Sequence, residues 1–239
     1  DAVGDAPVNR CELAEAAPKP ARRAVVADPT PAAAPVEMPK VDQAAEARRL
    51  AGTAGDLAAL AEAMRGFDGL DLKKGARNFV FADGNPAARV MIVGEAPGAD
   101  EDAQGRPFVG RAGKLLDKIL EAMKLSRRDV YIANILKCRP PNNRDPLPDE
   151  VEQCLGYLHE QIRLIRPKLI CALGRVAAQN LLKTTTPLGK LRKRWHTFSG
   201  TPMLVTYHPA ALLRFPQYKR DTWEDMQMLL ARLDEIKAQ

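Results

Sequence analysis

Aromatic residues, cysteines and long apolar runs are all scarce in this chain of 239 residues. Aromatic side chains make up 5% of it, and its four cysteines are widely spaced with no C-x-x-C pair. Four scattered cysteines are too few for the disulfide framework of a secreted protein, so a reducing compartment is expected. No apolar run reaches the roughly 18 residues of a membrane span, and no apolar segment of a signal peptide lies near Asp1. We therefore expect a soluble cytoplasmic protein that does not bind membranes.

Two common ligand-binding patterns are also missing. The stretch GRPFVGRAGK resembles a phosphate-binding loop, but Arg111 and Ala112 follow its second glycine, where that loop requires Lys and then Ser or Thr. The chain has three histidines, and neither His159 nor His196 has a second ligand at a spacing typical of zinc sites. The sequence thus predicts neither nucleoside triphosphate binding nor a zinc site.

Charge is distributed unevenly along the chain. Lys and Arg number 36 against 30 Asp and Glu, and residues 161–239 contain 14 of these basic side chains but only five of the acidic ones. Such an asymmetry favours a polyanionic partner facing the C-terminal third, although a well-solvated surface would also account for it. The segment KLRKR at 190–194 has the same two interpretations, as a phosphate-binding loop or as a solvated one.

The composition divides the chain into a tail and one domain. Residues 1–40 are rich in Ala and Pro and have no periodic apolar face, which predicts a flexible tail. The domain is expected over residues 41–239. At its start, the segment 47–67 places Leu50, Leu57, Leu60 and Met64 on one stripe of a helix.

The remainder alternates between apolar runs and helical patterns. Runs continuous in Val, Ile and Leu predict strands at 89–94, 129–135, 168–174 and 203–208. Helices are expected at 110–125, at 148–165 beginning with Pro148, directly after the third strand, and at about 217–237. Strands that are apolar on both faces and separated by helices indicate parallel pairing. The predicted fold is a three-layer α/β/α domain with a four-stranded parallel central sheet.

Polar residues follow these strands and should gather at one edge of the sheet. Ligands of such sheets bind beyond the carboxyl ends of the strands. Those ends carry GEAPGADED, NILKCRPPNNR, LGR and YHPAALLR. Asp100, Glu101 and Asp102 are consecutive and cannot all face one centre, so we expect one or two of them to be functional.

Three residues at this edge could hold a base. The amide of Asn134 offers an acceptor beside two donors, which suits the N3 and O4 edge of a pyrimidine, and Phe108 could stack on a base. His208 ends the fourth strand, and Pro209 is expected to force an extended or turn geometry after it. Each residue also has a purely structural interpretation, as a strand end or as part of the core.

The short segment after His208 is unusually apolar for a surface loop. Leu212 and Leu213 precede Arg214, and two exposed leucines beside an arginine would suit a wedge inserted into a base stack.

Five ordered segments, GEAPGADED, GRPFVGRAGKLLD, NILKCRPPNNRDP, LIRPKLICALG and YHPAALLR, resemble the motifs of the family 4 uracil-DNA glycosylases. The resemblance covers approximately residues 67–233. It implies the uracil-DNA glycosylase fold and cleavage of the N-glycosidic bond of uracil in DNA, leaving an abasic site.

The resemblance also implies roles for individual residues. Gly94, Glu95 and Ala96 would form a wall of the uracil pocket, Phe108 would stack on the base, Asn134 would read its N3 and O4 edge, and His208 would donate to O2. Ala96 stands where classical uracil-DNA glycosylases carry an aspartate, so another carboxylate must orient the water. We expect Glu101 in that role, with Glu95 as the second choice.

The remaining expected contacts are with DNA. Residues implied or favoured for this role are Arg111, Lys190, Arg192, Leu212, Leu213 and Arg214.

One departure from the family concerns its [4Fe-4S] cluster. Cys138 and Cys154 match two of its four cysteine ligands, but Phe67 and Leu70 stand where the other two are expected. Two thiolates cannot hold the cluster unaided, and neither Cys11 in the tail nor Cys171 inside a strand is a convincing substitute. We therefore predict that the cluster is absent and that Phe67 and Leu70 fill its place.

Three functions are compatible with the sequence. The first is a monomeric uracil-DNA glycosylase of base-excision repair that acts on single- or double-stranded DNA. The second is a protein that binds damaged bases or abasic sites with little catalysis, and the third is an enzyme of free nucleosides or nucleotides. The third suits the apolar wedge and the basic C-terminal third less well.

Overall fold

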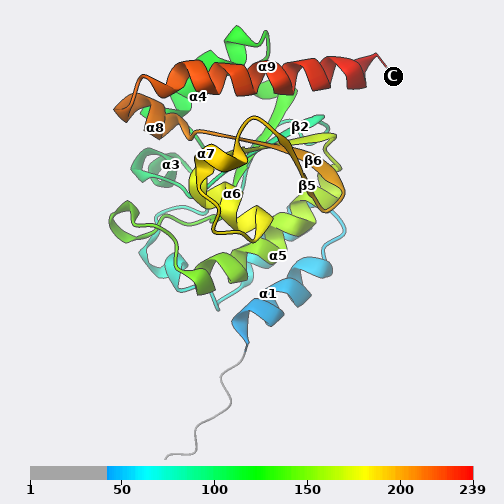
Figure 1. The fold of residues 1–239 in the computed structure, drawn as a ribbon. Helices are drawn as coiled ribbons and strands as arrows, with labels where there is room; N and C mark the ends of the chain where they lie inside the picture. The colour runs from blue at the N-terminus through cyan, green and yellow to red at the C-terminus, as the bar shows by residue number, and fades with distance from the viewer. Residues whose placement is uncertain (1–41, 239) are drawn as a thin grey trace, which may run out of the picture. The chain divides into compact units, whose positions relative to one another are not determined.

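The centre of the fold is a six-stranded sheet (Figure 1). The structure is a computed structural model that describes residues 42–238, so the predicted tail over residues 1–40 lies outside the described part. The strands lie in the order β1-β3-β2-β4-β6-β5. Their bounds are β1 Asp83–Gly84, β2 Val90–Gly94, β3 Val130–Asn134, β4 Leu169–Leu173, β5 Trp195–Phe198 and β6 Thr201–Thr206.

The four predicted strands are confirmed as the parallel core of this sheet. Strands β3, β2, β4 and β6 pair in parallel, whereas β1 and β5 join the two edges in antiparallel orientation. Neither edge strand was expected. The first has only two residues, and the second is mostly half-buried or exposed, so neither produces the continuous apolar run that predicts an inner strand.

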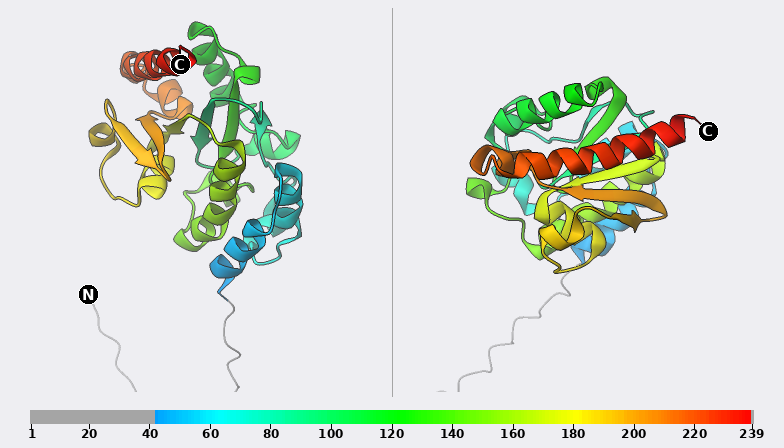
Figure 2. Two further views of the ribbon diagram at one scale, coloured as in Figure 1. Left: turned by 90° about the vertical axis from the view of Figure 1, so that its right-hand side faces the viewer. Right: turned by 45° about the horizontal axis from the view of Figure 1, so that its top comes forward.

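Helices cover both faces of the sheet (Figures 1 and 2). Met91 and Val93 of β2 pack in the cluster that contains α1, α2, α5 and α6, whereas Val90 and Ile92 pack against α4 and α9. This alternation buries both faces and confirms the three-layer α/β/α architecture. The helix bounds are α1 Gln43–Gly52, α2 Leu57–Gly66, α3 Ala99–Gln104, α4 Arg111–Ala122, α5 Pro148–Ile165, α6 Gly174–Leu182, α7 Leu188–Leu191, α8 Pro209–Arg214 and α9 Tyr218–Lys237, with 3-10 turns η1 Asp71–Gly75, η2 Arg127–Asp129 and η3 Pro141–Asn143.

Two predictions about helices were wrong. The single stripe expected over 47–67 is divided between α1 and α2, because α1 ends at Gly52 and the Asp56 side chain accepts from the Ala59 amide to begin a new helix. After His208 the chain forms α8 instead of an extended turn. Proline is tolerated at the first helical position, so Pro209 begins this helix rather than preventing it.

The order of the inner strands fixes where a ligand can bind. The chain runs from β2 to β3 on one side and then crosses to β4 and β6 on the other. At such a reversal the segments that follow neighbouring strands separate and leave a crevice at the carboxyl edge of the sheet. No helix among residues 42–238 is long and apolar enough to cross a membrane.

Candidate functional site

A cavity of about 610 Å³ lies at this carboxyl edge and is lined by segments that follow β2, β3, β4 and β6. The residues expected at the site that line it are Glu95, Ala96, Glu101, Phe108, Asn134, His208 and Arg214. The structure therefore brings the residues proposed to contact a base into one cavity.

Asn134, at the end of β3, presents an unpaired acceptor. The residue is 2% exposed, and among the described residues its Oδ1 has no hydrogen-bond partner. Gly94 lies beside it at the end of β2, where an added Cβ would be 2.4 Å from Asn134 Oδ1 and 2.5 Å from Phe108 Cζ. Only glycine therefore lets the amide and the phenyl ring approach this strand end together. A buried unpaired amide oxygen that lines a cavity is typical of a ligand site.

Lys137 anchors the backbone of Asn134 through a hydrogen bond to its carbonyl. This lysine is completely buried, and its Nζ donates to the Asn134 carbonyl at 2.8 Å and to Gln161 Oε1 at 2.6 Å. Burial lowers the pKa of Lys137 to about 7. This residue was not predicted, because nothing in its local sequence pattern distinguishes a buried lysine from an exposed one.

The geometry of His208 fixes its tautomer. Its Nδ1 accepts from the Ala210 amide at 3.2 Å as the N-terminal cap of α8, so a neutral ring carries its proton on Nε2. Burial, assisted by Arg214 and opposed by Glu101, lowers the pKa of His208 to about 4. The imidazole lies 5.4 Å from the Phe108 ring, centroid to centroid. It is therefore a neutral donor at neutral pH.

The carboxylate oxygens of Glu101, the first choice for orienting a water, already accept hydrogen bonds from backbone amides. Its Oε1 accepts from the amides of Val109 and Gly110 at 2.8 and 2.9 Å, and its Oε2 accepts from Gly98 at 3.1 Å. A buried carboxylate with three such bonds fixes two loops to each other. The geometry favours a structural task for Glu101.

Glu95 is the better placed carboxylate. It lines the cavity, and no hydrogen bond or ion pair joins its side chain to another residue of the described chain. Burial, assisted by the Asp145 carboxylate and opposed by Arg175 and Arg214, raises the pKa of Glu95 to about 7. A carboxylate with this pKa can take a proton near neutral pH.

The predicted wedge needs a correction. Leu212 is 1% exposed and faces the inside of the protein from α8, so it does not belong to the surface that could enter DNA. Leu213 is 39% exposed, and Phe215, which was not predicted for this role, is 48% exposed. The sequence does contain a signal for this role, because an aromatic residue follows Arg214 directly. The exposed apolar pair beside the cavity is thus Leu213 and Phe215.

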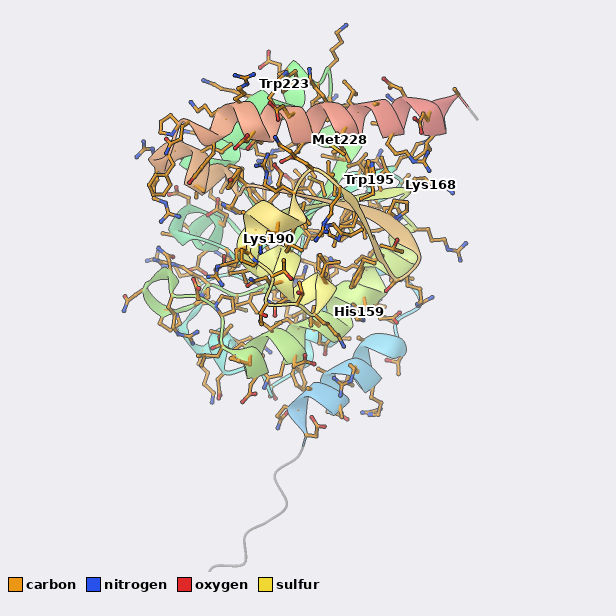
Figure 3. The ribbon with its side chains drawn as sticks, in the orientation of Figure 1. His159, Lys168, Lys190, Trp195, Trp223 and Met228 are labelled. Carbon is orange, nitrogen blue, oxygen red and sulfur yellow. The ribbon has the colours of Figure 1, made fainter. Side chains whose placement is uncertain are left out.

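The basic residues expected to contact DNA also separate into two groups. Arg192 was wrongly assigned to the DNA surface, because it is buried, donates through Nε to Asp225 at 2.7 Å and lies 4.4 Å from the Tyr207 ring centroid. Arg111 and Lys190 are exposed, the latter on α7 (Figure 3).

Three charged residues of the cavity wall were not predicted from the sequence. Arg144 donates to Glu150 at 2.8 and 2.5 Å, and Arg175 donates to Asp145 at 2.5 Å. Arg144, Asp145 and Arg175 line the cavity. The segments PPNNRD, which contains Arg144 and Asp145, and LGR, which contains Arg175, were the signals, because each follows a strand on the ligand side of the sheet.

The residues at the position of the family's iron-sulfur cluster do not fit four-thiolate ligation. Cys138 and Cys154 are buried, and burial raises the pKa of their thiols to about 11 and about 12, respectively. Phe67 and Leu70 are 5% and 1% exposed, and the Phe67 ring lies 6.3 Å from that of Tyr157. Among residues 42–238 no group of three His, Cys, Asp or Glu could hold a metal, and Cys11 lies outside the described residues.

Comparisons with known proteins agree with this geometry. The family model described as Uracil DNA glycosylase superfamily matches residues 81–227, which include all six strands and the cavity. A Type-4 uracil-DNA glycosylase of Archaeoglobus fulgidus is 48% identical over 167 residues, which are 66% of this chain and 84% of that protein. Proteins of the same description from Pyrobaculum aerophilum and Saccharolobus solfataricus are 42% and 44% identical, over 72% and 70% of this chain and 92% and 82% of their own lengths.

Proposed function

Because the chain belongs to the uracil DNA glycosylase superfamily, we propose that it flips uracil out of DNA and hydrolyses its N-glycosidic bond in base-excision repair. The observation that carries this proposal is the unpaired, buried Oδ1 of Asn134 in the cavity that Phe108 and His208 also line. Uracil offers an N3–H donor beside the O4 acceptor, which complements a carboxamide. Cytosine presents an acceptor and an amino donor there, so it does not complement an amide whose Oδ1 faces N3 and whose Nδ2 faces O4.

Loss of the base as an anion is the step that needs assistance. When the glycosidic bond breaks, its electron pair moves into the uracil ring and the sugar becomes oxocarbenium-like. His208 donates its Nε2–H to O2, where negative charge accumulates, while Phe108 stacks on the ring. A donor that is already oriented and uncharged stabilises this charge without rearranging during the reaction.

Water then completes the hydrolysis. We assign its orientation to Glu95, because the oxygens of Glu101 are already bound by three backbone amides. The water oxygen bonds to C1′ of the sugar, and its proton passes to the Glu95 carboxylate. The uracil anion takes up a proton from solvent at N1 after it leaves, and Glu95 returns its proton to solvent. The products are free uracil and an abasic site.

This assignment predicts a pH dependence. Glu95 must be ionised to accept a proton, and its pKa is raised to about 7, so kcat/KM should fall about tenfold per pH unit below that value and level off above it. His208 has a pKa of about 4 and stays neutral over the same range. The measurement is single-turnover excision between about pH 5 and pH 9.

The Glu95→Gln variant is the control for this profile. It should be slower and should lose the inflection near pH 7, because glutamine does not titrate. An unchanged inflection in this variant would assign the titration to another group and remove Glu95 from the role.

The surface around the cavity suits DNA. We propose that Leu213 and Phe215 fill the space left by the flipped nucleotide, and that Arg214, Arg111 and Lys190 meet phosphates. The protein is expected to act as a monomer in the cytoplasm, on uracil in single- or double-stranded DNA.

We also propose that the protein works without an iron-sulfur cluster. Two buried, protonated thiols and two apolar side chains occupy the position of its four ligands. Protein purified without oxygen should contain no stoichiometric iron and show no cluster absorption in the visible range. Iron at cluster stoichiometry would contradict this proposal.

The direct test of the function uses a labelled oligonucleotide with one uracil. After incubation with the protein, alkali should cleave the strand at the uracil position, and a control strand with thymine there should stay intact. Tight binding with no cleavage would instead identify a protein that recognises damaged bases or abasic sites without chemistry.

A further inference from the structure

The loop that carries Phe108 has a strained backbone. Phe108 adopts a φ of 55°, in the left-handed region that non-glycine residues rarely occupy. Such a conformation persists only where the surroundings hold it in place. Gly113 of α4 packs directly against the Phe108 carbonyl, since an added Cβ there would lie 1.7 Å from the carbonyl oxygen.

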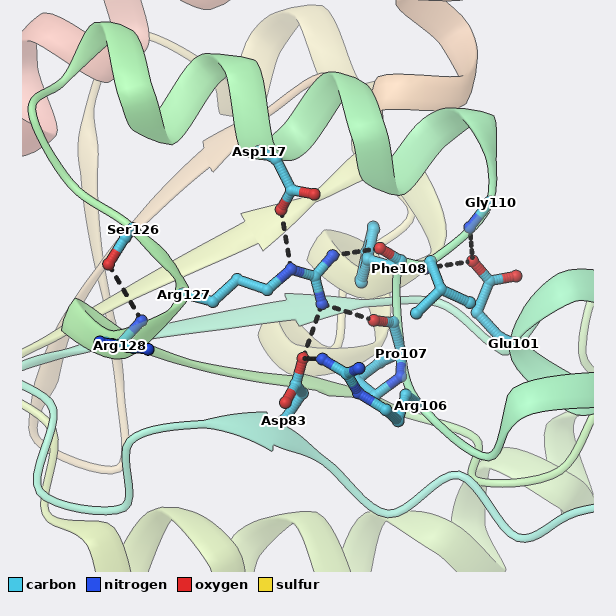
Figure 4. Close-up of polar contacts among 11 residues, drawn as sticks. Asp83, Glu101, Arg106, Pro107, Phe108, Gly110, Asp117, Ser126, Arg127 and Arg128 are labelled. Atoms are coloured by element: carbon cyan, nitrogen blue, oxygen red, sulfur yellow. Dashed lines mark hydrogen bonds and ion pairs between the residues drawn. The ribbon is translucent and has the colours of Figure 1, made fainter.

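Two oppositely charged side chains hold this loop from its two ends (Figure 4). Glu101 accepts from the amides of Val109 and Gly110, the two residues after Phe108. Arg127 donates through one terminal nitrogen to the Pro107 carbonyl at 3.0 Å and through the other to the Phe108 carbonyl. The four consecutive residues 107–110 are thereby fixed through their own backbone groups.

Arg127 is itself held rigidly. Its Nε donates to Asp117 of α4 at 2.7 Å, and the terminal nitrogen that reaches Pro107 also donates to Asp83 of β1 at 2.7 Å. Asp83 accepts a further bond from Arg106 at 3.0 Å. The Arg127 side chain is 19% exposed, and it does not line the cavity.

The chemistry of this contact requires a guanidinium. Its planar fork presents several N–H donors at fixed angles, so one side chain can bind two carboxylates and two neighbouring carbonyls at once. The ammonium of lysine carries three donors on one nitrogen atom at the end of a flexible side chain. That nitrogen cannot reach all four of these acceptors at once. The arrangement therefore supports a specific role for arginine at position 127 beyond carrying a positive charge.

From these contacts we infer that Arg127 is a positioning residue for uracil excision, which holds the Phe108 ring in the orientation that receives the flipped base. This inference rests on the proposed function, because it assumes that Phe108 stacks on uracil. Arg127 does not touch the substrate in this scheme. It acts through the carbonyls of Pro107 and Phe108 and, through its carboxylate partners, links the loop to β1 and α4.

The Arg127→Lys variant tests this inference, with Arg128→Lys as its matched control. Arg128 is the next residue of the same turn, is exposed, and makes no side-chain hydrogen bond or ion pair with the described residues. Displacement of a substrate-positioning group by about 1 Å costs on the order of 100-fold in rate. We expect single-turnover excision to fall roughly 10- to 100-fold in Arg127→Lys and to stay unchanged in Arg128→Lys.

Two DNA probes separate positioning from general damage to the fold. DNA with 2′-fluoro-2′-deoxyuridine keeps an uncleaved base to stack, whereas a tetrahydrofuran abasic analogue has no base. Arg127→Lys should bind the first more weakly and the second as well as the unmodified protein does. Equal weakening on both probes would show a merely structural role and overturn the inference.

A third readout does not depend on the reaction. With 4-fluorophenylalanine in place of the six phenylalanines, the ¹⁹F signal of Phe108, identified by its loss in Phe108→Leu, should shift or broaden in Arg127→Lys. The signal of Phe198, in the opposite core, should not change. An unchanged Phe108 signal overturns the inference whatever the activity is. A changed signal in a protein that excises no uracil would contradict the proposed function and leave the positioning of Phe108 by Arg127 supported.

Discussion

The His208→Ala variant is expected to excise uracil about 100- to 1,000-fold more slowly than the unmodified protein, with little change in its affinity for DNA. The donor at Nε2 is already oriented, because Nδ1 accepts from the Ala210 amide. Its hydrogen bond to O2 strengthens as the base gains charge, so its loss affects the transition state more than the bound substrate. Single-turnover excision and binding to 2′-fluoro-2′-deoxyuridine DNA measure the two effects separately.

Loss of a histidine in general should not have this effect. His159→Ala is the matched control, because His159 is exposed on α5 and lies away from the cavity (Figure 3). It should excise uracil at the normal rate. If His208→Ala excised uracil as fast as the unmodified protein does, the His208 imidazole would have no part in the mechanism.

The Asn134→Asp variant should show the second large effect. The substitution keeps the shape of the side chain but replaces the donor that faces O4 with an oxygen, and it places an ionisable group at a position that is 2% exposed. Loss of one preorganised donor costs about 100- to 1,000-fold, and an unpaired buried charge adds to that cost. Competition between uracil and cytosine strands should show that the preference for uracil decreases with the rate.

Stability has to be measured beside the activity of this variant. Thermal unfolding of Asn134→Asp shows whether the protein is folded at the assay temperature. A folded variant with normal excision and normal discrimination against cytosine would show that Asn134 does not read the base.

Much of the fold follows from local patterns. The helix over 148–165 was predicted with the bounds that the structure gives, because Pro148 marks its first turn and its apolar face is continuous. The inner strands were predicted because burial on both faces leaves runs of Val, Ile and Leu. One edge strand has two residues and the other is mostly half-buried or exposed, so neither leaves such a run, and the start of α2 depends on one capping carboxylate.

The site was predictable where its residues follow strands directly. Asn134 is the last residue of β3 and His208 lies two residues beyond the end of β6, and the topology of a parallel sheet brings those strand ends together. The ion-pair partners of a charged side chain, in contrast, could not be predicted from the sequence. Arg192 pairs with Asp225, 33 residues away, and Arg127 pairs with Asp83, 44 residues away. No spacing in the sequence indicates which arginines are buried in ion pairs and which remain free for DNA.

The exposure of Leu212 also could not be predicted from the sequence. The segment PAALLR was expected to expose both leucines, because a turn was predicted there. Since the segment is helical, one leucine faces the core and the next faces outward, and Phe215 follows on the exposed side.

The most direct test of the whole account is a crystal structure of the His208→Ala variant bound to DNA that contains 2′-fluoro-2′-deoxyuridine. We predict that the uracil lies inside the cavity, with the Asn134 amide on its N3 and O4 edge and the Phe108 ring stacked on its face. A uracil that stays within the DNA stack, or that is flipped to a position outside this cavity, would contradict it.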